Sequence, residues 1–229
     1  MDFNIRNHAV LNIGGVEVWI TETIVNTWIV MGILVVFGLI VRAKLKSFAE
    51  TPKGFQNFIE LLVETFDGFL NNTAGKHLSF LGPWFFTVFA FIMLSNFSGL
   101  FFLRPPTADW ATTFAAAIST FILIQVMGLK FRGTGYIKTF FEPIWVFFPL
   151  NVIGEIARPI SLSFRLFGNI LGGMIILALF YNQVPIFFQF GFPIALHVFF
   201  DLVYGVLQTY IFCVLSLSFI GVATNVASD

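Results

Sequence analysis

Polar residues recur at helical spacing inside the most apolar part of this sequence. Between residues 143 and 228 the only formally charged side chains are Glu155, Arg158, Arg165 and Asp201. A helix completes a turn in about 3.6 residues, so residues three or four apart lie on one face. Two sets of polar residues have this spacing: Asn151, Glu155, Arg158, Ser161, Arg165 and Asn169 in the first, and His197, Asp201, Tyr204 and Gln208 in the second.

Ionisable side chains in so apolar a region indicate a function, because it is costly to remove a charge from water. Arg165 is the clearest case, since a guanidinium keeps its proton in a protein. It must face water, an acid on this chain, or an acid on another chain. Two helices with one polar stripe each most simply face each other or a common aqueous cavity.

The same residues also have structural interpretations, which the sequence leaves open. Glu155 and Arg158, three residues apart, are spaced for a local ion pair. His197 stands near the start of its expected helix, where it could lie at a membrane interface. Asp201 could pair with Arg158 or Arg165 and serve only to hold helices together. Beside the first stripe, small residues would let another backbone approach closely; these are Gly168, Gly172 and Gly173.

The composition requires that lipid surrounds most of the chain. Of 229 residues, 58% are hydrophobic and only 10% are charged, whereas a soluble domain has about 25% charged residues. This excludes a soluble enzyme. The net charge of zero gives no reason to expect a nucleic-acid partner. The single cysteine, Cys213, excludes an internal disulfide framework, and we expect it to be a small buried hydrophobe.

The sequence predicts five membrane-spanning helices, since about 20 mostly apolar residues cross a bilayer. Three are expected at 24–41, 78–103 and 110–129, each followed by a basic residue. The region after residue 143 is long enough for two more, divided at the turn-forming stretch 181–185. We therefore expect an all-α integral membrane protein whose last two helices are long and carry the polar stripes.

A further helix is expected along the membrane surface. In 55–70 apolar residues recur at three- and four-residue spacings against acidic ones, which is typical of an amphipathic interfacial helix. Segment 136–148 is a shorter candidate of the same kind. For both, the alternative is a polar loop with scattered apolar residues. We expect one membrane domain over 1–229, with an external segment at 1–23, spans one to three with interfacial helices at 24–142, and two long helices with the polar stripes at 143–229.

Basic residues beside the spans predict the orientation, because they favour the cytoplasmic side. One cluster follows the first span and another follows the third. The loop between the second and third spans has only Arg104, offset by Asp109. We therefore expect the amino end outside and the carboxyl end in the cytoplasm. The basic clusters are Arg42, Lys44, Lys46 and Lys53, then Lys130, Arg132 and Lys138.

Segment 158–169, which reads RPISLSFRLFGN, closely resembles the signature of subunit a of the F-type ATP synthases, and the resemblance covers roughly the whole chain. It implies a non-catalytic subunit that provides two ion half-channels and couples H⁺ or Na⁺ flow to rotation of the c-ring and ATP synthesis. It implies that Arg165 is the essential arginine facing a ring carboxylate, supported by Asn169 and Gln208. The implied partners are the c subunits, the peripheral-stalk b subunits, the rest of the synthase and the lipid of a bacterial-type plasma membrane. No cofactor or metal is expected.

Two positions depart from the family pattern. Many members have an acidic residue or histidine nine positions after the arginine, where this chain has Met174. The partner position on the last helix, often histidine or glutamate, is Asp201. We therefore expect Asp201 to be the main ionisable relay of one half-channel, with His197 nearer its mouth and Tyr204 on the same face. The other expected path residues are Asn151, Glu155 and Ser161. The sequence leaves the coupling ion open.

Two other kinds of membrane protein compete with this interpretation. A secondary transporter with its own substrate site would favour internal repeats and broken helices, and no repeat is visible in the sequence. An intramembrane hydrolase would need a nucleophile with its base, or metal ligands. The three histidines are scattered, at His8, His77 and His197, and do not form such a set.

Labelling tests the predicted orientation. In a Cys213→Ser background, a cysteine beside Asp2 should react with a membrane-impermeant thiol reagent added outside. A cysteine beside Lys46 should react only when the reagent reaches the inside. The reverse pattern would show that the chain is inverted.

Overall fold

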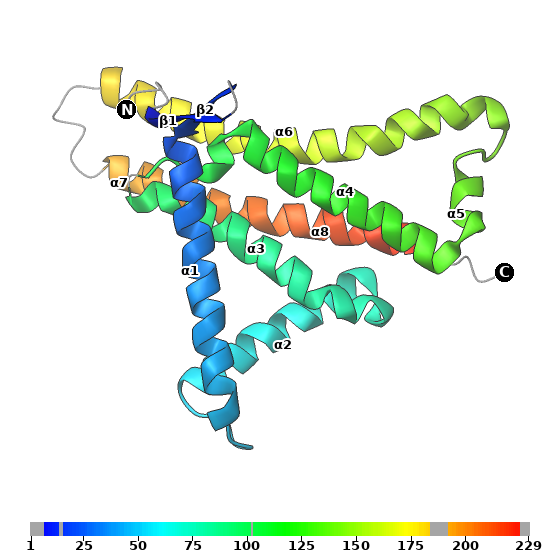
Figure 1. Ribbon diagram of the computed structural model, residues 1–229, viewed down its shortest axis with the longest axis horizontal. Helices are drawn as coiled ribbons and strands as arrows, with labels where there is room; N and C mark the ends of the chain where they lie inside the picture. Colours follow the sequence, from blue (N-terminus) through cyan, green and yellow to red (C-terminus); the bar gives the residue numbers. More distant parts are fainter. Residues whose placement is uncertain (1–6, 14–15, 102, 184–191, 225–229) are drawn as a thin grey trace. The chain divides into compact units, whose positions relative to one another are not determined.

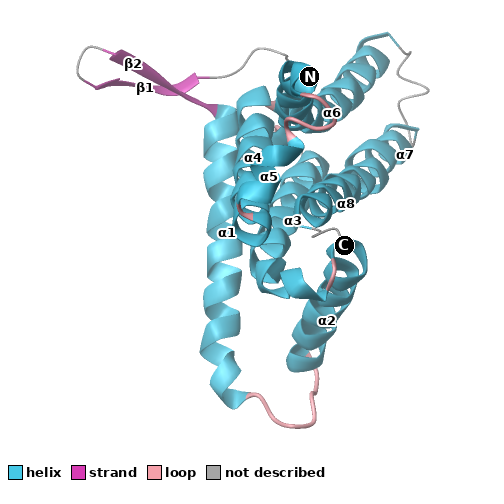
Figure 2. Cartoon of the chain, turned by 90° about the vertical axis from the view of Figure 1, so that its right-hand side faces the viewer, coloured by secondary structure: helices cyan, strands magenta, loops and turns pink. Residues whose placement is uncertain are grey.

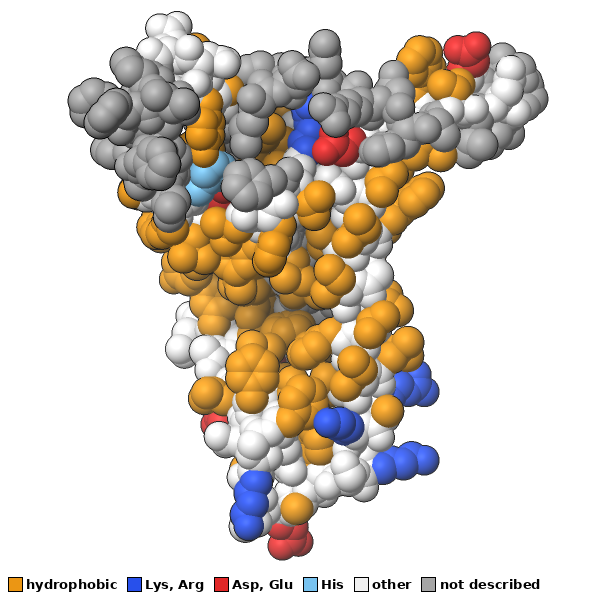
Figure 3. All heavy atoms as spheres, turned by 90° about the vertical axis from the view of Figure 1, so that its left-hand side faces the viewer, with side chains coloured by type: hydrophobic (Ala, Val, Ile, Leu, Met, Phe, Trp, Pro, Cys, Tyr) orange, Lys and Arg blue, Asp and Glu red, His pale blue; other side chains and the backbone are white. Residues whose placement is uncertain are grey.

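The computed structural model describes residues 7–13, 16–101, 103–183 and 192–224 (Figure 1). Within these ranges, five helical stretches are long and apolar enough to cross a membrane: Glu22–Ser47, Lys76–Phe101, Trp110–Arg132, Trp145–Gln183 and Ala195–Thr224. This confirms the expected all-α membrane protein with five spanning helices. Large hydrophobic side chains such as Trp28 and Val35 are exposed, and they cover much of the face drawn in Figure 3. Such a surface suits lipid rather than water.

The chain divides into two compact units. The first unit comprises the described residues of Met1–Lys46, Phe89–Thr113 and Leu166–Thr209, and the second those of Ser47–Val88, Phe114–Arg165 and Tyr210–Asp229. Several long helices contribute residues to both units. The prediction of one membrane domain stays a prediction.

The first unit begins with a β-hairpin that the sequence did not lead us to expect (Figure 2). Strand β1 (Asn7–Ile13) pairs antiparallel with β2 (Val16–Thr21), with Val10 opposite Trp19. The second strand is rich in β-branched and aromatic residues, which favour strands. Helix α1 (Glu22–Lys44) follows directly. Its buried Asn26 donates a hydrogen bond to the carbonyl of Arg104 at 2.9 Å, which fixes α1 to the loop after the second span.

A buried amide connects the second span to the last one within the first unit. Helix α3 (Gly82–Phe97) continues into the 3₁₀ turns η3 (Ser98–Phe101) and η4 (Pro106–Ala108). Asn96 Nδ2 donates to the Gly205 carbonyl at 3.1 Å and to Thr209 Oγ1 at 3.3 Å, while Thr107 Oγ1 donates to Asn96 Oδ1 at 2.7 Å. Asn96 is fully buried, so these bonds supply partners that lipid cannot.

The last span is not one regular helix. Helix α7 (Phe192–His197) passes into a π-helical turn, η7 (Val198–Tyr204), and then into α8 (Gly205–Thr224). Such turns are rare and frequently occur at functional sites. Asp201 lies in this turn. The sequence predicts a long helix here but gives no sign of the change in winding.

The second unit contains the expected surface helix. Helix α2 (Phe55–Ala74) confirms a helix over 55–70 and buries one side, which includes Ile59, Phe66 and Leu70, while Phe58 and Leu61 are exposed. The short turn η1 (Leu45–Ser47) precedes it and η2 (Lys76–Leu81) follows it.

The other expected surface helix, at 136–148, is interrupted. After α4 (Trp110–Arg132), helix α5 covers only Thr134–Thr139 and the turn η5 only Trp145–Phe147, before α6 (Phe148–Gln183) begins. Pro143 explains the gap, because proline lacks the N–H of a helix and restrains the residue before it. The Tyr136 ring packs against Gly128 so closely that a Cβ at position 128 would lie 2.7 Å from it. Helix α5 is thereby fixed to α4.

Candidate functional site

Arg165 is exposed on α6. It lines a cavity of about 230 Å³ in the second unit, together with Arg158, Ser161 and Phe219. Among the described residues of that unit, no hydrogen bond or ion pair engages the Arg165 side chain. The guanidinium is therefore presented at a surface that water or another chain can reach. A side chain at Gly168 would meet nothing within 4 Å, and the close approach of another backbone there stays a prediction.

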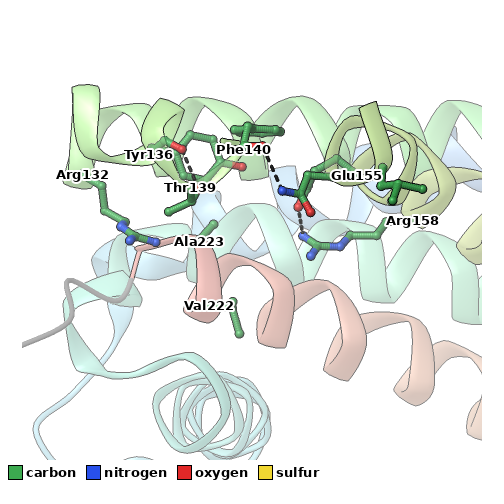
Figure 4. Close-up of a pocket in the computed structure, with 11 residues that line it drawn as sticks. Arg132, Tyr136, Thr139, Phe140, Glu155, Arg158, Val222 and Ala223 are labelled. Atoms are coloured by element: carbon green, nitrogen blue, oxygen red, sulfur yellow. Dashed lines mark hydrogen bonds and ion pairs between the residues drawn. The ribbon is translucent and has the colours of Figure 1, made fainter. Parts of the chain in front are cut away.

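A second cavity, of about 450 Å³, lies in the second unit beneath α5 (Figure 4). Arg132 and Arg158 point toward it from opposite sides. Glu155 forms an ion pair with Arg158 at 2.5 Å. The local ion pair, one of the alternatives left open by the sequence, is thus present. The cavity is lined by polar and apolar side chains, among them the Glu155 carboxylate.

Two side chains outside the predicted stripes form a chain of hydrogen bonds that ends at Glu155. Gln125 Nε2 on α4 donates to Glu155 Oε2 at 3.2 Å, and the Tyr136 hydroxyl on α5 donates to Gln125 Oε1 at 3.0 Å. Neither residue was predicted from the sequence. Gln125 had a usable signal, because an isolated amide inside an apolar span needs a partner. Tyr136 had none, because its contact depends on how the loop folds back.

Burial raises the pKa of Tyr136, and the negative charge of Glu155 raises it further. The positive charges of Arg158 and Arg132 act in the opposite direction with smaller effects. Tyr136 therefore stays protonated at neutral pH and can donate its hydrogen to Gln125. Because the tyrosine hydroxyl keeps its hydrogen, Tyr136 donates to Gln125, and Gln125 in turn donates to Glu155.

Two further predicted residues lie at these cavities. Asn151 lines the larger one, and its amide donates to the carbonyls of Phe140 at 2.9 Å and Glu142 at 3.0 Å. It therefore anchors the loop before α6. Ser161 is exposed and lines the smaller cavity with Arg165. The role of Asn151 and Ser161 in an ion path stays a prediction.

The first unit pairs the two ionisable groups of the last span. His197 Nδ1 lies 2.7 Å from Asp201 Oδ2, and the side chains are only 11% and 13% exposed. The ring of Tyr181, on α6, lies 6.1 Å from the His197 ring between centroids. His197 is therefore buried rather than free at a surface, and the partner that the structure gives Asp201 is this histidine.

The two predicted stripes also meet within the first unit. Asn169 Nδ2 on α6 donates to Gln208 Oε1 on α8 at 2.8 Å, and Gln208 is buried. Tyr204, from the same stripe, is half-buried, and no hydrogen bond from it is described in this part of the chain. Met174 on α6 is half-buried as well. The second stripe runs through the π-helical turn Val198–Tyr204, which contains Asp201 and Tyr204.

The described residues hold no cluster of three or more His, Cys, Asp or Glu side chains that could bind a metal ion. Cys213 is buried, as expected of a small hydrophobe. The chemistry that the described groups can support is movement of ions or protons between oxygen and nitrogen atoms. These features define a multi-pass helical membrane protein with ionisable groups inside its spans.

Comparison with known proteins identifies the family. Residues 24–221 match the family model described as ATP synthase A chain. Subunit a of ATP synthase from Moorella thermoacetica is 36% identical over 219 residues, which cover 95% of this chain and 96% of that protein. Subunit a from Syntrophobacter fumaroxidans is 38% identical over 202 residues, covering 84% and 80%. A protein from Propionigenium modestum named ATP synthase subunit a, sodium ion specific, is 32% identical over 222 residues, covering 88% and 73%.

This chain therefore belongs to the ATP synthase A chain family, which confirms the resemblance seen at residues 158–169. It is a multi-pass membrane protein with the role of subunit a in an ATP synthase complex, in ion transport and ATP synthesis. Membership of this family argues against the alternative interpretation of the sequence, which was a secondary transporter with its own substrate site.

The electrostatic effect of Glu155 on Tyr136 predicts a measurable change in pKa. Glu155→Gln should lower the pKa of Tyr136, because it removes a negative charge that disfavours the phenolate. The pKa should stay above its ordinary value, because burial is the larger cause. Absorbance titration of the purified synthase, taken as a difference from Tyr136→Phe, measures it. Glu142→Gln, at an exposed position of the same loop, should leave the pKa unchanged, and an equal effect of both substitutions would contradict the assignment.

Proposed function

We propose that this chain supplies the two ion half-channels of its synthase and the arginine that separates them. The observation that carries the proposal is Arg165, which is exposed on α6 and has no polar partner among the described residues of its own unit. A charge that cannot be neutralised by losing a proton needs an acid or water beside it. A carboxylate on the ring of c subunits is an acid of this kind.

Arg165 would act by electrostatics alone. A cation close to a carboxylate favours its ionised form, so a ring carboxylate that reaches Arg165 releases its bound ion. The fixed positive charge also repels cations that would pass directly from one half-channel to the other. In this proposal the chain forms and breaks no covalent bond and is a non-catalytic subunit.

The two groups of ionisable residues would serve the two half-channels. With the amino end outside, α6 runs outward and the last span runs inward. Glu155, Asn151 and the larger cavity then belong to the inner half-channel. Asp201 and His197, near the outer end of the last span, belong to the outer one. Asn169, Ser161, Tyr204 and Gln208 would line the path between these residues and the ring.

The remaining parts of the proposal concern the surroundings of the chain. Its partners are the c-ring and the peripheral-stalk b subunits, and its location is a bacterial-type plasma membrane with the carboxyl end in the cytoplasm. It acts as one membrane domain, whose ion-translocating part is 143–229. The coupling ion is H⁺ or Na⁺, and the name of the Propionigenium modestum relative is the reason to include sodium.

Substitution of Arg165 tests the central part of the proposal. Arg165→Ala should abolish ion-driven ATP synthesis in membrane vesicles while the synthase still assembles. Arg165→Lys should largely fail as well, because an amine can lose its proton when it is desolvated. Arg42→Ala, which removes an exposed cation at the end of α1, is the matched control and should synthesise ATP normally. Normal coupled synthesis with Arg165→Ala would overturn the proposal.

Substitution of Asp201 distinguishes a relay from a structural group. Asp201→Asn should slow ion flux per assembled complex without reducing the number of complexes, because the amide keeps the shape but cannot carry a proton. Met174→Glu in the same chain should restore part of the flux, since it returns a carboxylate to the facing helix. A structural role predicts fewer complexes with normal flux in each. Counting complexes and flux in the same vesicles separates the two.

A further inference from the structure

The Asp201 carboxylate occupies space that a side chain at position 99 would need. Gly99 lies in the turn η3 at the end of the second span, and both residues belong to the first unit. A Cβ built on Gly99 would lie 2.9 Å from Asp201 Cγ, 3.0 Å from Oδ1 and 3.2 Å from Oδ2. Carbon atoms do not approach so closely without a shift of one group. The carboxylate therefore rests directly on the backbone of Gly99.

The backbone conformation does not require this glycine. The glycines with positive φ among the described residues are Gly54, Gly75 and Gly133, so Gly99 has a conformation that other residues adopt. It is also buried. The feature of Gly99 that matters here is its lack of a side chain, and the group that fills the space is the carboxylate of Asp201.

The turn that carries Asp201 is fixed on both sides. On one side, the carboxylate pairs with His197 at 2.7 Å. On the other side, Asn96, three residues before Gly99, donates to the carbonyl of Gly205, the first residue after the π-helical turn. The end of the second span therefore sets both the position of the turn and the space for its carboxylate.

We propose that Gly99 is a positioning residue for the outer half-channel, because it reserves the volume in which the Asp201 carboxylate lies against His197. The inference rests on the proposed role of Asp201 as an ion relay. The inference has a specific consequence. Because the carboxylate of Asp201 lies against Gly99, the carboxylate of an aspartate at position 99 would occupy the same place as that of Asp201.

Gly99→Ala tests the reserved volume. The added methyl group should displace the carboxylate from His197 and lower ion flux per assembled complex by roughly tenfold or more, since misplacing a reacting group by about 1 Å can cost on the order of a hundredfold in rate. Gly32→Ala in α1 is the matched control, because nothing lies within 4 Å of its added methyl group. It should leave the flux unchanged. Wild-type flux per complex with Gly99→Ala would overturn the inference.

Moving the carboxylate from position 201 to position 99 tests the consequence of the inference. In an Asp201→Ala background, Gly99→Asp should restore part of the flux, whereas the isosteric Gly99→Asn should restore none. A role of Gly99 in packing alone would make the two substitutions equivalent, so equal flux with Asp and Asn contradicts the inference.

Two comparisons keep the outcomes distinct. If Asp201→Asn itself has normal flux, the proposed relay fails. If Asp201→Asn slows flux and Gly99→Ala does not, only the positioning role fails. Should Gly99→Ala reduce the number of assembled complexes, Gly99→Ala with Asp201→Ala should recover it, because the methyl group then has room. Equally poor assembly of the double variant would contradict the clash.

Discussion

The hydrocarbon core of a bilayer offers no water, so polar groups inside it must find partners in the protein. The polar side chains of these spans follow this rule in pairs. Asp201 pairs with His197, Asn169 with Gln208 and Glu155 with Arg158. In a bilayer, each of these polar groups would be energetically unfavourable without a partner. The spans that carry them are mainly apolar, so each pair marks a place where polar chemistry can occur in the chain.

Arg165 differs from these paired groups because its side chain is exposed. A charged side chain at the centre of a bilayer is unfavourable by about 3 kcal/mol or more, and Arg165 lies on a helix that is long and apolar enough to cross a membrane. Subunit a works within an ATP synthase complex, and a partner chain of the membrane sector is the natural source of an acid beside it. The same constraint that pairs the other polar groups is our reason for proposing that Arg165 contacts another subunit.

The sequence predicted those features that depend on local periodicity. The five spans follow from runs of about 20 mostly apolar residues, and the helix at 55–70 follows from the spacing of its apolar residues. The features it missed depend on contacts between different spans or on local backbone winding. Gly99 and Asp201 lie in different spans, and nothing in either segment shows that they touch. The π-helical turn, the β-hairpin and the contact of Tyr136 with Gln125 likewise come from the folded chain.

The central claim is that the surface around Arg165 faces the ring, and cross-linking in the assembled synthase measures this most directly. Ser161 lies one turn before Arg165, is exposed and lines the same cavity. In a Cys213→Ser background, Ser161→Cys should form a disulfide with a cysteine placed one turn from the ring carboxylate. Leu166→Cys, at a fully buried position of the same helix, should form none. A product at the exposed Val35→Cys on α1 with none at Ser161→Cys would contradict the account.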